Sequence, residues 1–107
     1  MSDEVVVVAT FHALPGKADA VEAELQDAIV RTHEEPGCIR YALHRSLDGG
    51  DVVMFIERWE SREALAAHGQ QPYITRIGGA LAGLTTGPVE LHFLEPRPAG
   101  DPVKGVL

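Results

Sequence analysis

The sequence predicts one small α+β domain, in which strands and helices follow one another in the order β-α-β-β-α-β. The chain has 107 residues, which is the size of a single ordinary domain. Runs rich in β-branched residues alternate with segments whose apolar residues recur at helical spacing. The run DGGD at 48–51 predicts a tight hairpin turn between two of the strands, because glycine accepts the positive backbone angles that such a turn needs.

The first strand is expected from Val5 to Leu14, since the run VVVVATFHAL is too rich in β-branched residues for a helix and is followed by Pro-Gly. A helix is expected from Lys17 to about Glu34, where Pro36 and Gly37 stop it. Its predicted apolar face consists of Ala18, Val21, Leu25, Ala28, Ile29 and Thr32.

The second half of the chain repeats the alternation of strand and helix. Strands are expected from Cys38 to about Leu47 and from Val52 to about Trp59, on either side of the hairpin turn. Ser61 has the character of a helix N-cap, and the short helix that follows should close at Gly69. A second helical stretch then runs from Pro72 to about Leu84, and a last strand alternates Val89, Leu91 and Phe93 with polar residues.

This order of elements is the ferredoxin-like split βαβ arrangement, whose antiparallel sheet has the first and third strands in its centre. Both of these strands are apolar on both faces (VVVVA and VVMFI), whereas helices can cover only one face. We therefore expect a homodimer that buries the other sheet faces against each other. Residues 1–95 should form the domain, and residues 96–107 a tail that is flexible or packs on the partner subunit.

Composition narrows the classes of partner. Sixteen acidic residues against nine basic ones give a net charge of −7, which argues against a nucleic-acid partner. No apolar stretch approaches the roughly 20 residues of a membrane span, and the first residues lack the features of a secretory signal, so we expect a cytoplasmic protein without a membrane partner. Cys38 is the single cysteine and is interpreted as a small apolar residue of the interior, with no metal site.

Four segments together carry a family resemblance: FHALPGK, EPGCIRY, FIERWESREALAAH and PYITRI. From Val5 to Leu94 the chain resembles the antibiotic biosynthesis monooxygenase superfamily, including its quinol monooxygenases. The resemblance implies a dimeric α+β barrel in which each subunit holds a pocket between its helices and its sheet. It also implies a choice of activities, because members include cofactor-free oxygenases of aromatic polyketides and quinols, haem-degrading enzymes and small-molecule isomerases.

Haem degradation fits this chain poorly, since haem-degrading members use an asparagine on the first strand. The chain contains no asparagine, and its first strand offers Thr10 and His12 instead. Three functional classes stay open: a cofactor-free oxygenase, an isomerase or similar proton-transfer enzyme, and a non-catalytic ligand-binding or stress-response protein.

The candidate site is expected at the end of the third strand, where Phe55 and Trp59 share one face and the next helices bring His68 and Tyr73 towards them. In the oxygenase hypothesis, His68 or His12 deprotonates a small aromatic hydroquinone, phenol or polyketide, whose anion reacts directly with dioxygen. The substrate is its own reductant, so neither a cofactor nor a metal is expected.

The remaining candidates would bind that substrate. An indole supplies an apolar wall and one N–H donor, and a phenol can hydrogen-bond a substrate oxygen. The predicted substrate-binding residues are Trp59, Tyr73, Phe55, Thr10 and Arg76. Purely structural roles are the alternative: Trp59 as a core residue, His68 as a helix-end residue beside the helix dipole, and Glu57 as an ion-pair partner of Arg58 or Arg62.

Overall fold

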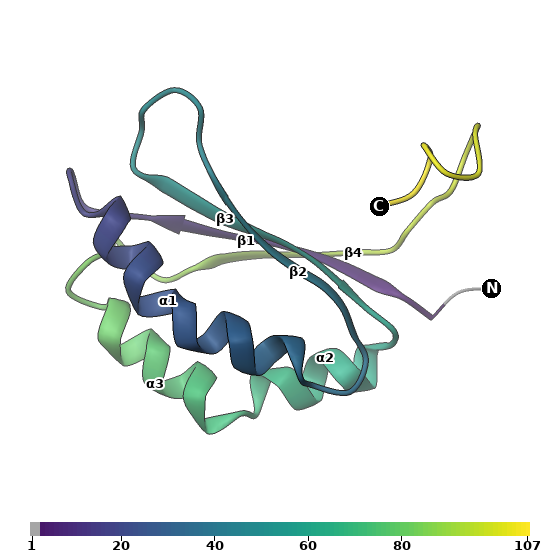
Figure 1. Ribbon diagram of the computed structural model, residues 1–107, viewed down its shortest axis with the longest axis horizontal. Helices are drawn as coiled ribbons and strands as arrows, with labels where there is room; N and C mark the ends of the chain where they lie inside the picture. Colours follow the sequence, from purple (N-terminus) through teal and green to yellow (C-terminus); the bar gives the residue numbers. More distant parts are fainter. Residues whose placement is uncertain (1–2) are drawn as a thin grey trace.

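The computed structural model describes residues 3–107 and confirms the predicted order of elements (Figure 1). The three helices all lie on one side of a single sheet, and the chain after the last strand turns to the other side (Figure 1). The elements are β1 (Val5–His12), α1 (Ala18–His33), β2 (Cys38–Arg45), β3 (Val52–Trp59), α2 (Arg62–Gly69), α3 (Pro72–Leu81) and β4 (Glu90–Leu94). None of these helices is long and apolar enough to cross a membrane.

The sheet has the ferredoxin-like order β2-β3-β1-β4, and all neighbouring strands are antiparallel. This confirms that the first and third strands are central. β1 and β3 pair along their full length, from Val5 opposite Trp59 to His12 opposite Val52. The register fixes which side chains share a face, because successive residues of a strand point to opposite sides.

The loop between α3 and β4 makes two elements shorter than predicted. The backbone N–H of Leu84 donates to the carbonyl of Leu81 at 2.9 Å, so that α3 ends at Leu81 instead of about Leu84. The carbonyl of Leu84 in turn accepts a hydrogen bond from the N–H of Leu14 at 2.8 Å. Leu14 is thereby held by the loop, and β1 ends at His12.

The core lies between the helices and one face of the sheet. On β3 the burial pattern alternates, and Val53, Phe55, Glu57 and Trp59 are the buried residues. Phe55 and Trp59 therefore share one face, as predicted. α1 packs over this face through the buried stripe that its spacing predicts, of which Ile29 alone stays partly exposed. The largest side chains that are fully enclosed are Trp59, Phe55 and Leu25.

The opposite face of the sheet carries the alternate residues of β1 and β3 and has no helix over it (Figure 1). We call it the open face; its apolar centre consists of Val6, Val8, Val52, Met54 and Ile56. One end of it is covered by the last residues of the chain, where the Arg58 guanidinium donates to the carbonyl of Leu107 at 2.6 Å. The same guanidinium forms an ion pair with Glu4 at 2.7 Å.

Candidate active site

A cavity of about 520 Å³ lies between the sheet and helices α2 and α3. This volume falls within the range of small-molecule sites in proteins. Helix-facing residues of β1, β3 and β4 form one wall, and α2 and α3 form the other. Most of the lining is apolar, with large contributions from Phe11, Phe55, Leu65, Ile77, Leu91 and Phe93.

A wider depression of about 770 Å³ adjoins this cavity and has three of the same lining residues, Arg62, Leu65 and Phe93. Its remaining lining is rich in carboxylates, from Asp3, Glu4, Glu63 and Glu95. The cavity is therefore apolar, whereas the neighbouring surface is acidic.

Glu57 is the one carboxylate among the described residues that line the cavity. It is only 4% exposed, and its Oε1 accepts a hydrogen bond of 2.9 Å from the Trp59 indole N–H. Burial raises the pKa of the Glu57 carboxyl, while the Trp59 hydrogen bond and nearby His68 act in the opposite direction. The predicted alternative, an ion pair of Glu57 with Arg58 or Arg62, is wrong for Arg58, which pairs with Glu4 across the sheet instead.

His68 is placed in the cavity wall by α2. The helix starts at Ser61, whose hydroxyl accepts a hydrogen bond from the Ala64 N–H at 3.1 Å, as the N-cap prediction expects. Two turns later His68 points into the interior, 8% exposed, with its ring centroid 4.7 Å from that of Trp59 and 5.4 Å from that of Tyr41. The imidazole thus packs against two aromatic rings.

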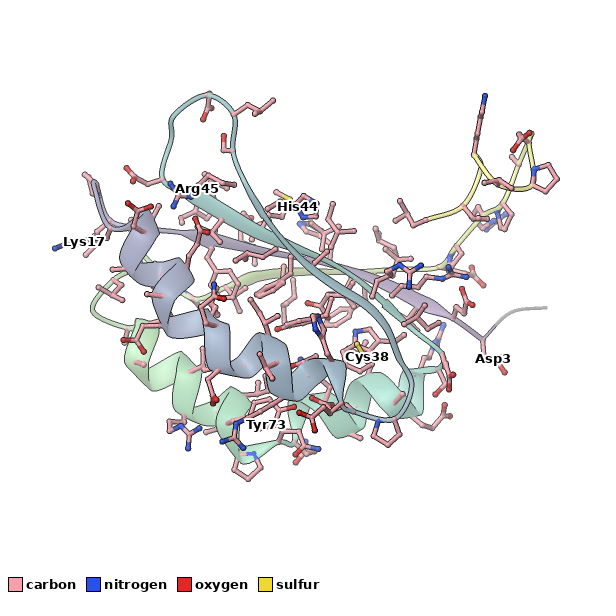
Figure 2. The ribbon with its side chains drawn as sticks, viewed as in Figure 1. Asp3, Lys17, Cys38, His44, Arg45 and Tyr73 are labelled. Atoms are coloured by element: carbon pink, nitrogen blue, oxygen red, sulfur yellow. The ribbon has the colours of Figure 1, made fainter. Side chains whose placement is uncertain are left out.

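A carboxylate at the end of α1 completes the arrangement. Glu35 Oε2 lies 2.9 Å from His68 Nδ1 and also accepts a hydrogen bond from the Tyr73 hydroxyl. Burial and this hydrogen bond raise the pKa of Tyr73 to about 12. The arrangement thus joins residues of three segments, the α1–β2 turn, α2 and α3, and Figure 2 shows Tyr73 in the helix layer beneath the sheet.

The structure brings together four of the residues predicted from the sequence. Phe55 and His68 line the cavity, while Trp59 lies directly behind His68 and Tyr73 is linked to it through Glu35. Tyr41, which the prediction did not include, stacks on Phe55 with ring centroids 4.2 Å apart and also lines the cavity.

Three other candidates lie away from the cavity. Thr10 and His12 belong to the open face, where His12 Nε2 lies 3.1 Å from Glu90. Arg76 is on the exposed side of α3, 3.8 Å from Asp27 of α1. Cys38 is half-buried against the core, on the helix side of the sheet, whereas His44 lies on the other side (Figure 2).

Glu35, like Tyr41, is a residue of the candidate site that the sequence did not predict. Glu35 begins the segment EPGCIRY, whose proline and glycine indicate a helix stop but not the partners of the carboxylate. Within residues 3–107 no group of three or more His, Cys, Asp and Glu residues is arranged to hold a metal ion.

Comparison with known proteins identifies the family. The model of the family described as "Antibiotic biosynthesis monooxygenase" matches residues 4–78. The chain belongs to the antibiotic biosynthesis monooxygenase family. It is 38% identical over 96 residues to "Putative monooxygenase Rv0793" of Mycobacterium tuberculosis, which covers 90% of this chain and 94% of that protein.

Solved structures of the antibiotic biosynthesis monooxygenase family have the same fold. The structure of Rv0793 superposes with a TM-score of 0.82 and 34% identity over 92% of this chain and 99% of that one. The structure of PA3566 from Pseudomonas aeruginosa superposes with a TM-score of 0.79 and 30% identity over 88% of this chain and 94% of that one. SnoaB from Streptomyces nogalater, described as a cofactor-independent oxygenase, superposes with a TM-score of 0.79 and 24% identity over 92% of this chain and 97% of that one. This similarity is one of fold.

Proposed function

We propose that this protein is a cofactor-independent monooxygenase that oxidises a small aromatic hydroquinone, phenol or polyketide with dioxygen. The observation that carries the proposal is an apolar cavity with its polar groups, Glu57 and His68, gathered on one side. Membership of the antibiotic biosynthesis monooxygenase family supports the reaction type, as does the fold likeness to SnoaB, which is described as a cofactor-independent oxygenase.

The cavity favours a neutral, flat molecule with a hydroxyl group at one edge. Aromatic side chains such as Phe11 and Phe55 offer ring faces and edges to an aromatic substrate, and their rings meet edge to face 6.1 Å apart. The carboxylates around the adjoining depression, together with Glu57 inside, repel anionic ligands. A neutral phenol or hydroquinone meets both conditions and becomes an anion only after binding.

His68 is the proposed general base, since it is the one imidazole among the described residues that line the cavity. It takes the hydroxyl proton of the substrate, and the resulting phenolate is electron-rich enough to react with dioxygen. For a hydroquinone the balance is one quinol plus one O₂, giving one hydroxyquinone plus one water. The substrate supplies all the electrons, one oxygen atom enters the ring, and the other leaves as water.

The active form is proposed to be a homodimer joined through the open faces of two sheets. Val8, Met54 and Ile56 are apolar residues at the centre of this face, with no helix over them. Monomers rarely leave a contiguous apolar sheet surface in water, and a second copy of the same face would cover it with matching twist.

Oxygen consumption tests the function directly. We would add a panel of hydroquinones and anthrones to the purified protein in an oxygen electrode, without flavin or metal, and expect stoichiometric uptake of dioxygen above the uncatalysed rate. Conversion of a substrate without oxygen would favour an isomerase instead. Saturable binding without any turnover would favour a ligand-binding protein.

A further inference from the structure

The contact between Glu35 and His68 constrains where the imidazole carries its proton. Glu35 Oε2 lies 2.9 Å from His68 Nδ1, and the two side chains are 8% and 10% exposed. An ionised carboxylate can only accept hydrogen bonds, so Nδ1 must be the donor in this contact. A neutral imidazole has one N–H, and Nε2 is therefore left with its lone pair available to take a proton.

The Tyr73 hydroxyl holds the carboxylate in this position. It donates to Glu35 Oε2, the same oxygen that faces Nδ1. In addition, the Arg31 guanidinium lies over the Tyr73 ring, 5.8 Å from its centroid. Glu35 is thus oriented by a neighbour that does not itself line the cavity.

The backbone around Glu35 is fixed just as closely. Its N–H donates to the Thr32 carbonyl at 3.0 Å, and its carbonyl accepts from the Cys38 N–H at 3.2 Å. Two residues after Glu35, Gly37 has a φ of +88°, a left-handed conformation that favours glycine. The turn therefore has a defined shape that starts at the last residues of α1.

Gly37 also brings the turn into direct contact with α2. A Cβ atom at this position would lie 2.5 Å from the Cβ of Ala64, closer than side chains can approach. The Gly37 carbonyl accepts a hydrogen bond of 2.9 Å from the N–H of Glu60, just before α2. Since His68 is on the same helix one turn after Ala64, this contact sets the separation of Glu35 and His68.

We propose that Glu35 is the positioning residue of His68. It selects the Nδ1–H tautomer and leaves Nε2 as the proton acceptor. The Glu35-Pro36-Gly37 turn holds the Glu35 carboxylate in the position that this requires. The proposal rests on the proposed function in that His68 is taken as the base. When the substrate hydroxyl gives its proton to Nε2, the Nδ1–H stays with Glu35, and the carboxylate compensates the positive charge of the imidazolium.

The tautomer is measured without substrate, by ¹⁵N NMR of the imidazole in the full-length protein. At about pH 9, above the ordinary range of imidazole titration, we expect His68 of the wild type to carry its hydrogen on Nδ1. In Glu35→Gln the amide can donate to Nδ1 as well as accept from it, so the preference for the Nδ1–H form should be lost and the Nε2–H form should gain population. Glu34→Gln is the matched control, because Glu34 is an exposed carboxylate of the same turn.

Activity provides the second readout. Glu35→Gln should lower kcat by roughly 10²-fold, because a base in the wrong tautomer loses most of its effect, with little change in KM. Glu35→Asp should recover part of this loss, and Glu34→Gln should match the wild type. Gly37→Ala, which moves the turn away from Ala64, should reduce both kcat and the Nδ1–H population.

A wild-type His68 protonated on Nε2 would overturn the proposal, and so would a Glu35→Gln variant that keeps the wild-type tautomer and turnover. Failure of the proposed function has a different signature. If the wild type oxidises no member of the panel, the monooxygenase assignment fails, while the tautomer measurement still decides the role of Glu35.

Discussion

The indole N–H of Trp59 donates to Glu57 Oε1 at 2.9 Å, between two residues of the same strand face. This bond ties a fully buried aromatic ring to the carboxylate that lines the cavity. It also lowers the pKa of Glu57, against the larger effect of burial, which raises it. Trp59 therefore acts on the cavity through Glu57 and His68, since it is not itself part of the lining.

Trp59→Phe should raise KM several-fold and destabilise the fold. The variant removes the donor to Glu57, which leaves a buried carboxylate without its hydrogen bond and costs about 1–3 kcal/mol. Denaturant unfolding and steady-state kinetics measure the two effects. Unchanged KM with lower stability would mean that Trp59 is only a core residue.

Relative to the wild type, the Glu57→Gln variant should be more stable at neutral pH than it is at acidic pH. Because burial raises the pKa of Glu57 above its ordinary value of 4.5, the folded state binds this proton more tightly than the unfolded state. Wild-type stability attributable to Glu57 is thus fully present below about pH 4.5 and is lost as the pH rises through the raised pKa. Urea titrations of both proteins across this range isolate the effect of Glu57, since the stability of the wild type relative to the variant should fall as the pH rises.

His68→Ala should lower turnover by roughly 10²- to 10⁴-fold while the fold stays intact, as expected for loss of a positioned base. Arg76→Ala is a suitable control, because Arg76 is exposed on α3 and lies away from the cavity. Full activity of His68→Ala together with a loss in His12→Ala would move the base to His12. If neither variant nor their combination loses activity, base catalysis by the protein is rejected.

Ile56→Asp should dissociate the proposed dimer without unfolding the subunit, because Ile56 is a partly exposed residue of the open face. Val7→Asp should instead prevent folding, since Val7 is 1% exposed and belongs to the core on the helix side. Sedimentation velocity and circular dichroism distinguish these results. A wild type that sediments as a monomer at micromolar concentration would contradict the dimer.

Tyr73 should resist ionisation up to a pH of about 12, compared with the ordinary value of 10.0. The folded-state pKa is the higher one, so the stability due to the neutral phenol is fully present below pH 10 and is lost as the pH rises through about 12. Absorbance of tyrosinate at 295 nm follows the titration, and Tyr73→Phe identifies the contribution. In Glu35→Gln we expect Tyr73 to ionise at lower pH, because its carboxylate partner has been removed.

The fold was predictable because its signals are local. Strand composition, the N-cap at Ser61 and the glycine turn of the hairpin each depend on a few neighbouring residues, and the doubly apolar runs identified the central strands. The end of β1 was not predictable, because it is set by the hydrogen bond between Leu14 and Leu84, which are far apart in the sequence. The end of α3 is set in the same loop, where the Leu84 N–H turns back to the carbonyl of Leu81.

The site was predictable only in part for a related reason. His68 and Phe55 could be placed near each other from the strand face and the following helix, and both line the cavity. Thr10 and His12 lie on the side of β1 that faces away from the helices. Successive residues of a strand point to opposite sides, and the sequence of a doubly apolar strand does not indicate which side the helices cover. The role of Glu35 was not predictable because its partners, His68 and Tyr73, lie 33 and 38 positions away in the sequence.

The alternation of β3 has a practical consequence for engineering. Phe55 and Glu57 face the cavity, whereas Met54 and Ile56, immediately beside them in the sequence, face the opposite way. A mutant library at Phe55 and Glu57 can therefore explore new ligands without altering the outward surface of the strand. Conversely, substitutions at Met54 and Ile56 can test or adjust the proposed association of subunits while the lining of the cavity is left as it is.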